Sequence, residues 1–263
     1  MATPSSVDIS ELTKGPSKKL GGIKIDAVTD KDPYINMLIY GDPGAGKTVL
    51  AGSAQAVADM SPVLIVDVEG GSFSLRDFYP TVEVARVVTW QDLYDVYMAL
   101  YKGEGGYKTI VLDSLTELQK LSMQTIMKEV VAKEPERDPE VPSIREWGKN
   151  GEQTRRFVRA FRDLPANVIF TCLVVNDKDQ KTGKIMYRPS LSGKLSLEVA
   201  GYMDIVVFAY SKMMKVDEQD KICRFLLTGM TDTHVAKDRS NRLPQVVEDP
   251  SMETIHKYIF TGD

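Results

Sequence analysis

A glycine-rich segment that ends in lysine and threonine has the residue types and spacing of a phosphate-binding loop. Residues 41–48 are GDPGAGKT and match G-x-x-x-x-G-K-[ST] without a mismatch. Glycines let the backbone curl so that successive N–H groups face a phosphate, the lysine neutralises phosphate charge, and the threonine hydroxyl ligates Mg²⁺. A plain strand-to-helix turn is the alternative. We predict a nucleotide site formed by Gly41, Asp42, Pro43, Gly44, Ala45, Gly46, Lys47 and Thr48.

Acidic residues at the ends of two apolar runs could supply the remaining chemistry. Asp113 ends KTIVLD, and with a phosphate loop upstream we predict that it binds Mg²⁺ together with Thr48. A helix-capping role for Asp113 is the alternative. Glu69 closes IVDVE at the rim where ligands of parallel sheets bind, so it could orient the attacking water. Asp67 is its rival, and an ordinary strand-end acid is the alternative; the predicted catalytic set is Lys47, Glu69 and Asp113.

The elements that must position these residues follow from the apolar runs. Strands separated by crossover helices predict an α/β fold, with a mostly parallel sheet flanked by helices on both faces and β-hairpin additions. One hairpin is expected over residues 177–188, turning at Thr182 and Gly183, and a second turns around residues 217–220. The expected strands are residues 35–40, 62–68, 82–88, 108–113, 168–175 and 203–210.

Helix signals lie between these runs. A helix is expected from the phosphate loop through Met60, and the sequences TWQD (89–92) and SLTE (114–117) fit capping boxes that open two more. Three prolines and many charges predict an exposed loop over residues 134–148. A helix over residues 152–164 and a closing helix after Pro250 complete the set.

Composition limits the kinds of protein that the chain can be. It has 263 residues, 33 Lys and Arg against 37 Asp and Glu, and a net charge of -4, which excludes a generally basic nucleic-acid binder. No apolar run approaches the ~20 residues of a membrane span, and two cysteines, Cys172 and Cys223, are too few for a disulfide scaffold or zinc site. We expect a cytoplasmic protein with a tail (1–20), one main domain (21–248) and a C-terminal helix (249–263) packed on it.

The order of motifs resembles the RecA-like P-loop ATPase core. In that core a glutamate follows the second strand and an Asp-Ser pair follows the Walker-B strand, which here correspond to VDVEGG (66–71) and VLDSLTEL (111–118). IREWG (144–148), PSLSGK (189–194) and AKDRSNRLP (236–244) extend the likeness over about residues 35–245. With them, the chain looks like the bacteriophage single-strand annealing proteins of the Sak-four group.

This resemblance implies a function and partners. It implies an ATP- and Mg²⁺-dependent, homo-oligomeric ring or filament that binds single-stranded DNA in phage recombination, in the cytoplasm of a bacterial host. A single-strand-binding protein is a further implied partner, and a membrane is not. Lys237 and Arg239 correspond to a Lys-x-Arg element that reaches a neighbouring subunit's nucleotide; a solvated basic turn is the alternative. Relatives carry a polar γ-phosphate sensor after the Walker-B unit, for which this chain offers Thr171 or Asn176.

The resemblance also places DNA on loops after the Walker-B helix and the next strand, here residues 133–149 and 176–194. The second segment has a basic excess of +3, and its tyrosine could stack on a base. The alternative is a soluble hairpin in which lysines block edge pairing. The predicted DNA-binding residues are Lys178, Lys181, Lys184, Tyr187, Arg188 and Lys194.

Two other functions stay open at this point. A P-loop kinase acting on a small molecule or nucleotide needs an arginine-bearing lid, and Arg137 and Arg145 lie in a loop without forming a compact cluster. In a non-catalytic loading or assembly factor, ATP would set only the oligomeric state. DNA-stimulated ATP hydrolysis distinguishes the leading hypothesis from both.

Overall fold

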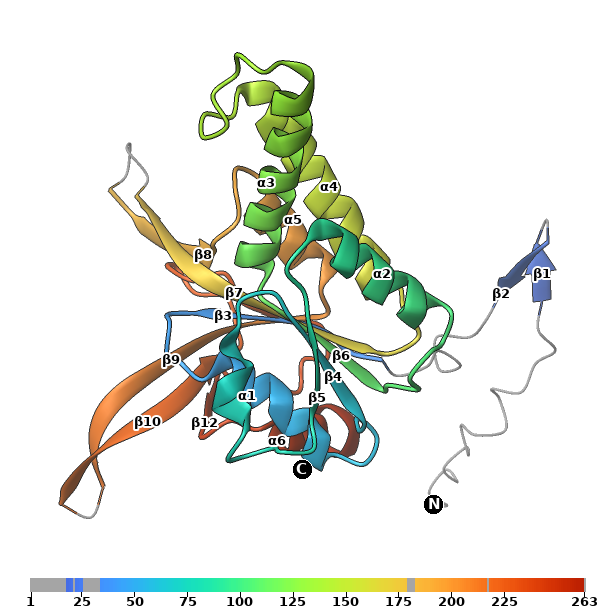
Figure 1. Cartoon of the computed structure of the whole chain (residues 1–263). Coiled ribbons are helices and arrows are strands. Elements are labelled where there is room, and N and C mark those ends of the chain that lie inside the picture. The colour runs from blue at the N-terminus through green and yellow to red at the C-terminus, as the bar shows by residue number, and fades with distance from the viewer. Residues whose placement is uncertain (1–17, 21, 26–33, 179–182, 217, 263) are drawn as a thin grey trace. The chain divides into compact units, whose positions relative to one another are not determined.

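The computed structural model describes residues 18–20, 22–25, 34–178, 183–216 and 218–262 (Figure 1). The chain divides into two compact units, Met1–Tyr34 and Ile35–Asp263. In the first unit, β1 (Lys18–Leu20) pairs with β2 (Ile23–Ile25) as an antiparallel two-stranded sheet. Every predicted site residue belongs to the second unit.

The second unit is built on one ten-stranded sheet. Six of its strands run parallel, namely β5, β4, β6, β7, β3 and β9 in spatial order, and these are the six strands predicted from the apolar runs. The other four pair antiparallel to their neighbours. The predicted α/β fold class is therefore confirmed. The strands are β3 (Asn36–Gly41), β4 (Val63–Asp67), β5 (Glu83–Arg86), β6 (Thr109–Asp113), β7 (Asn167–Lys178), β8 (Ile185–Pro189), β9 (Ile205–Val216), β10 (Gln219–Leu227), β11 (Lys237–Asp238) and β12 (Val246–Glu248).

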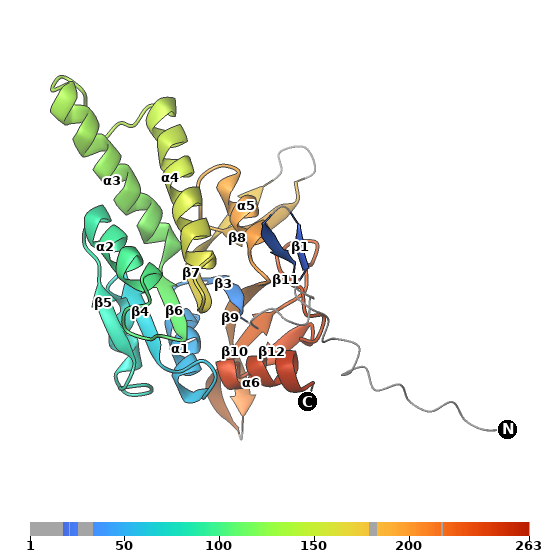
Figure 2. The ribbon, with the colours of Figure 1, turned by 90° about the vertical axis from the view of Figure 1, so that its right-hand side faces the viewer.

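Helices cover both faces of this sheet, because successive side chains of a buried strand point to opposite faces. On β3, Leu38 and Tyr40 pack beneath four helices, whereas Met37 and Ile39 face the other two. Figures 1 and 2 show these layers on either side of the strands. The first layer is α2 (Trp90–Tyr101), α3 (Leu115–Lys133), α4 (Ile144–Arg162) and α5 (Leu195–Tyr202), and the second is α1 (Lys47–Gly52) and α6 (Met252–His256).

Two helix boundaries differ from the sequence-based expectation. The helix predicted to reach Met60 ends as α1 at Gly52 and continues only as a 3₁₀ turn over Ser53–Ala56, because the Ser53 hydroxyl donates to the carbonyl of Leu50 at 2.6 Å. The loop predicted through residue 148 ends earlier, and α4 begins at Ile144. Ser143 and Glu146 form a capping box there, a signal that was present in the sequence.

The two predicted capping boxes have different outcomes. Thr89 accepts a hydrogen bond from the Asp92 N–H at 3.1 Å, and Asp92 accepts one from the Thr89 N–H, so that box is confirmed. Ser114 does precede α3, but its side chain makes no capping hydrogen bond. The second box was wrong: the Ser114 hydroxyl is buried without a partner among the described residues.

Both predicted hairpins are present. β7 pairs antiparallel with β8, and the predicted turn residue Thr182 lies outside the described residues. β9 and β10 form a long ribbon that extends beyond the layers of helices (Figure 1). α6 continues as a π-helical turn over Lys257–Thr261. None of the helices in the described part of the chain has the length and apolar character that a membrane crossing requires.

Candidate functional site

The phosphate loop connects β3 to α1 near the middle of the sheet. Gly44 and Gly46 have φ values of 80° and 89°, a left-handed backbone that glycine adopts without strain. The side chain of Lys47 is buried, and its Nζ donates to the carbonyl oxygens of Gly41 at 3.0 Å and Asp42 at 2.8 Å. The ammonium group is thus held inside the loop, where phosphate oxygens could replace these two carbonyls.

Close packing explains two of the glycines. A Cβ on Gly41 would lie 2.1 Å from the carbonyl oxygen of Ala209 on β9, so no larger residue fits there. A Cβ on Gly46 would lie 2.8 Å from Nε of Arg224. Arg224 on β10 therefore lies against the loop and brings a second cation to it. Sequence analysis missed Arg224. It follows the loop by more than 170 residues in the sequence, and no local pattern predicts that its antiparallel strand lies beside the loop.

A carboxylate joins the loop to two strands. Asp113 at the end of β6 is buried, and it accepts hydrogen bonds from Thr48 Oγ1 at 2.6 Å and from Thr171 Oγ1 on β7 at 2.5 Å. A Cβ on Gly71 would lie 3.7 Å from Asp113 Oδ2 and 3.9 Å from Thr48 Oγ1, so the backbone of Gly71 lies close to both oxygens. One carboxylate and one hydroxyl at this place suit Mg²⁺, which prefers few protein oxygens and keeps several waters.

The structure separates the two acids at the end of β4. Asp67 is buried, and its carboxylate accepts backbone N–H groups of Gly70 at 2.6 Å, Gly71 at 3.2 Å and Ser72 at 3.3 Å. It therefore holds the turn after the strand. Glu69 is exposed, and its own N–H donates to the carbonyl of Asp113 at 3.2 Å. Of the two, Glu69 is the one whose carboxylate has no hydrogen-bond or ion-pair partner among the described residues.

The charge on Lys47 depends on these acids. Burial lowers the pKa of Lys47, while Asp113 and Glu69, in that order, act in the opposite direction. Their electrostatic effect on the ammonium group means that both carboxylates lie within range of it. The site thus combines a buried cation, the buried Asp113 carboxylate and an exposed acid.

The two sensor candidates differ in position. Thr171 is fully buried on β7 and contacts Asp113, whereas Asn176 is exposed on the outer part of the same strand, paired with Tyr187 of β8. The structure therefore brings Thr171 into the site and leaves Asn176 outside it.

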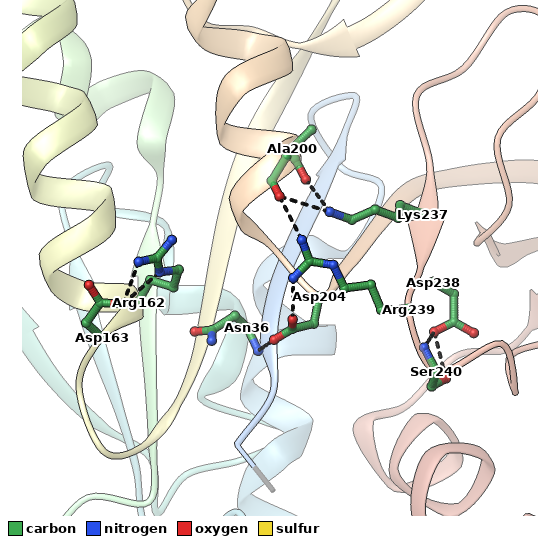
Figure 3. Close-up of polar contacts among 10 residues, drawn as sticks. Asn36, Arg162, Asp163, Ala200, Asp204, Lys237, Asp238, Arg239 and Ser240 are labelled. Carbon is green, nitrogen blue, oxygen red and sulfur yellow. Dashed lines mark hydrogen bonds and ion pairs between the residues drawn. The ribbon is translucent and has the colours of Figure 1, made fainter. Parts of the chain in front are cut away.

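Lys237 and Arg239 lie near the other end of the sheet (Figure 3). Lys237 of β11 is aligned with Val206 on β9, and Val206 is aligned with Leu38 on β3. Measured along the strands, Lys237 is therefore three residues, roughly 10 Å, from the level of Gly41, toward the start of β3. Its Nζ donates to the carbonyl oxygens of Ala200 at 2.8 Å and Gly201 at 3.2 Å.

Arg239 makes contacts of the same kind. It donates to the carbonyl oxygen of Gly201 at 3.1 Å and pairs with Asp204 at 2.9 Å. Lys237 and Arg239 therefore cap the carboxyl end of α5 and do not reach the phosphate loop of their own chain.

The predicted DNA-binding residues lie on and after the β7–β8 hairpin. Arg188 pairs with Asp177 at 2.6 Å, and Lys184 pairs with Asp232 at 3.7 Å. The Tyr187 ring stacks on His234, with centroids 4.6 Å apart, so one face of this ring is already covered. Lys178 and Lys194 are exposed, and Lys181 lies outside the described residues.

A small cavity beside the loop adds residues that sequence analysis did not select. It has a volume of about 250 Å³, and its walls include Gly46, Arg224, Tyr79 and Pro250. Its place beside the loop, against α1 and β10, makes it a candidate for the part of a nucleotide that the loop does not hold. It joins segments from distant parts of the sequence, which local patterns could not reveal.

The chain is similar to known proteins in the same region. A family model described as an AAA domain matches residues 34–240, and no curated protein matches the chain. Among solved structures, the flagellar accessory protein FlaH from Methanocaldococcus jannaschii has 10% identity, a TM-score of 0.40, and coverage of 73% of this chain and 78% of its own.

Two further structures are similar to a comparable degree. The RadB recombinase has 12% identity, a TM-score of 0.45, and coverage of 81% of this chain and 86% of its own. An ATPase from the type III secretion system of pathogenic bacteria has 15% identity, a TM-score of 0.43, and coverage of 66% of this chain and 51% of its own. Likenesses at this level do not extend to substrates or partners.

The family match spans the phosphate loop, Glu69 and Asp113. The fold brings these residues together where the parallel strands β3, β4 and β6 end. The loop fits a nucleotide phosphate, and the pair of Thr48 and Asp113 fits the metal that accompanies it. With this match over residues 34–240 and a mostly parallel sheet flanked by helices, the chain belongs to the AAA domain family and is a P-loop NTPase.

Proposed function

We propose that this protein is a RecA-like ATPase that binds single-stranded DNA and promotes annealing during phage recombination, in the cytoplasm of a bacterial host. The observation that supports ATP hydrolysis is that the two acids at and after the end of β4 differ in their contacts. Asp67 is occupied by three backbone N–H groups, whereas Glu69 remains free near Lys47 and Asp113. A site built only to bind nucleotide needs no such free acid.

Each site residue has a role in hydrolysis. The backbone N–H groups of residues 41–48 hold the β-phosphate, and Lys47 leaves its carbonyl partners to contact the β- and γ-phosphates. Thr48 and Asp113 hold Mg²⁺, which when bound neutralises charge on the phosphate oxygens. Glu69 orients the water that attacks the γ-phosphorus and accepts its proton as ADP departs. Thr171 keeps the Asp113 carboxylate in place.

DNA binding is assigned to the β7–β8 hairpin and the segment after it. The exposed cations Lys178 and Lys194 support contact with phosphates, and Lys181, Lys184 and Arg188 complete the proposed basic surface. Self-association into a ring or filament would bring several such hairpins onto one strand, which suits a chain with a net charge of -4. In that assembly, Lys237 and Arg239 would reach the nucleotide of a neighbouring copy, and a single-strand-binding protein would be a further partner.

Steady-state ATP hydrolysis with and without single-stranded DNA tests the proposal. We expect DNA to raise the rate and Lys47→Ala to abolish it. We also expect the DNA affinity to fall as salt rises, because phosphate contacts release counterions. Absence of both DNA binding and rate change would refute the DNA function, and transfer of phosphate to a metabolite would show a kinase instead.

A further inference from the structure

A second cavity lies along the outer face of α3 and is not part of the nucleotide site. Its volume is about 1010 Å³, at the upper limit of ordinary ligand pockets. One wall is the outer face of α3, and the opposite walls come from the proline-containing loop before α4 and from the β7–β8 hairpin and the segment after it. Figure 1 shows where α3, this loop and β8 lie in the fold. Most of the lining is apolar, and Met123, Met127, Val131, Pro142 and Trp147 are among it.

Two hydrogen-bond donors in the lining have no acceptor. Gln119 is 6% exposed, and its Oε1 accepts the N–H of Ser192 at 2.9 Å, but its Nε2 has no partner among the described residues. Arg188 pairs through one terminal nitrogen with Asp177, while its buried Nε likewise has no partner there. Because a buried donor without an acceptor is costly, both nitrogens favour a ligand that brings acceptor atoms.

The rim of the cavity is cationic. Lys120, Lys128 and Arg188 line it against a single carboxylate, that of Glu140. Lys120 pairs with Glu117 at 2.6 Å, whereas Lys128 is exposed and has no ion-pair partner among the described residues. An apolar interior with unpaired donors and a cationic rim suits a flat group that carries acceptors and is attached to a phosphate.

We propose that this cavity captures unpaired bases of single-stranded DNA, with Trp147 as the stacking surface and Gln119 and Arg188 as donors to the base edge. This inference rests on the proposed DNA function and extends it from the backbone to the bases. An unpaired base offers carbonyl and ring-nitrogen acceptors, and its faces pack against Trp147 and the adaptable methionines. A peptide fits less well, because among the described side chains of this lining the unpaired buried atoms are donors and not acceptors for its N–H groups.

The position of the cavity supports the same ligand. Arg188 and Val175 belong to the β7–β8 hairpin and also line the cavity, so a strand bound along that hairpin would enter it directly. Trp147 is 46% exposed at the edge, as a residue that receives a base from solvent should be. Base capture would hold a strand with its pairing edges turned away from other DNA until the base is released.

The test compares oligothymidylate with an abasic oligonucleotide of equal length and charge. The protein carries Trp90→Phe, because Trp90 packs on Phe157 and would otherwise obscure the fluorescence of Trp147. We expect oligothymidylate to quench this fluorescence and the abasic strand to leave it unchanged. Trp147→Ala should lower the affinity for oligothymidylate by about 5- to 150-fold, the range of base stacking, and leave the abasic affinity unchanged.

Two control variants separate base capture from general DNA binding. Ile144→Ala alters an exposed apolar residue of α4 outside the cavity and should change neither affinity. Gln119→Glu keeps the acceptor for Ser192 but removes the amide donor, and should weaken oligothymidylate binding only. Equal affinity for the two oligonucleotides with no effect of Trp147→Ala would overturn base capture while leaving the DNA function intact; no binding of either would refute both.

Discussion

Replacing Thr171 with valine removes one hydroxyl from the centre of the site with little change in shape. Thr171 is fully buried, and its hydroxyl donates to the buried Asp113 carboxylate at 2.5 Å. A hydrogen bond to a charged group contributes about 1.5–3 kcal/mol, so we expect the free energy of unfolding to fall by that amount. For a domain of this size the melting temperature should fall by roughly 3–12 °C.

Thr171→Ser is the matched control because it keeps the hydroxyl and loses one methyl group, at a cost of about 1 kcal/mol. Urea denaturation followed by circular dichroism measures both variants. Thr171→Val should also weaken Mg²⁺-dependent ATP binding, since the carboxylate that faces Thr48 would be less well held, whereas Thr171→Ser should preserve it. If the valine variant is as stable as the serine variant and binds ATP equally well, the hydrogen bond has no such role.

Three further predictions follow from single contacts. Gly41→Ala should prevent stable folding or lower the melting temperature sharply, because its Cβ would lie 2.1 Å from the Ala209 carbonyl; a normal unfolding curve would contradict this packing. Asp67→Asn should destabilise the turn after β4, seen as faster proteolysis there, and resistance equal to that of the wild type would refute the capping role. Hydrogen bonds from Ser143, with Arg137 nearby, lower the pKa of Glu146 from 4.5 to about 2. Its contribution to the free energy of unfolding is therefore present above pH 4.5 and lost as pH falls toward 2. In Glu146→Gln, the free energy of unfolding from urea denaturation should depend less on pH between 4.5 and 2; the same pH dependence as in the wild type would contradict this.

Local sequence patterns could predict that residues 41–48 form a loop between a strand and a helix and that Asp113 ends a buried strand. The motif at residues 41–48 specifies a backbone path, and Asp113 ends β6, which is separated from β3 only by β7, so both strands end on the same side of the sheet and Asp113 meets Thr48 there. The same patterns could not choose between Asp67 and Glu69, because both acids close one strand. The choice depends on which carboxylate receives the N–H groups of the following turn, and that is a property of the folded backbone.

Contacts between distant segments were beyond sequence patterns. Arg224 reaches Gly46 only because β10 pairs with β9, and Lys237 and Arg239 cap α5 only because β11 pairs with the start of β9. The capping box at Ser143 was visible in the sequence, but the neighbouring prolines favoured a loop. The cavity behind Trp147 requires three separate segments and has no local signature.

The central claim is that this site hydrolyses ATP. It is tested most directly by measuring the rate of single-turnover hydrolysis of bound ATP in Glu69→Gln, with Lys47→Ala measured in parallel. Glutamine keeps the size of the Glu69 side chain and cannot accept a proton from water. The variant should bind ATP as tightly as the wild type and hydrolyse it at least about 100-fold more slowly, the usual contribution of a general base. Lys47→Ala should lose binding itself. Wild-type turnover in Glu69→Gln would contradict the account.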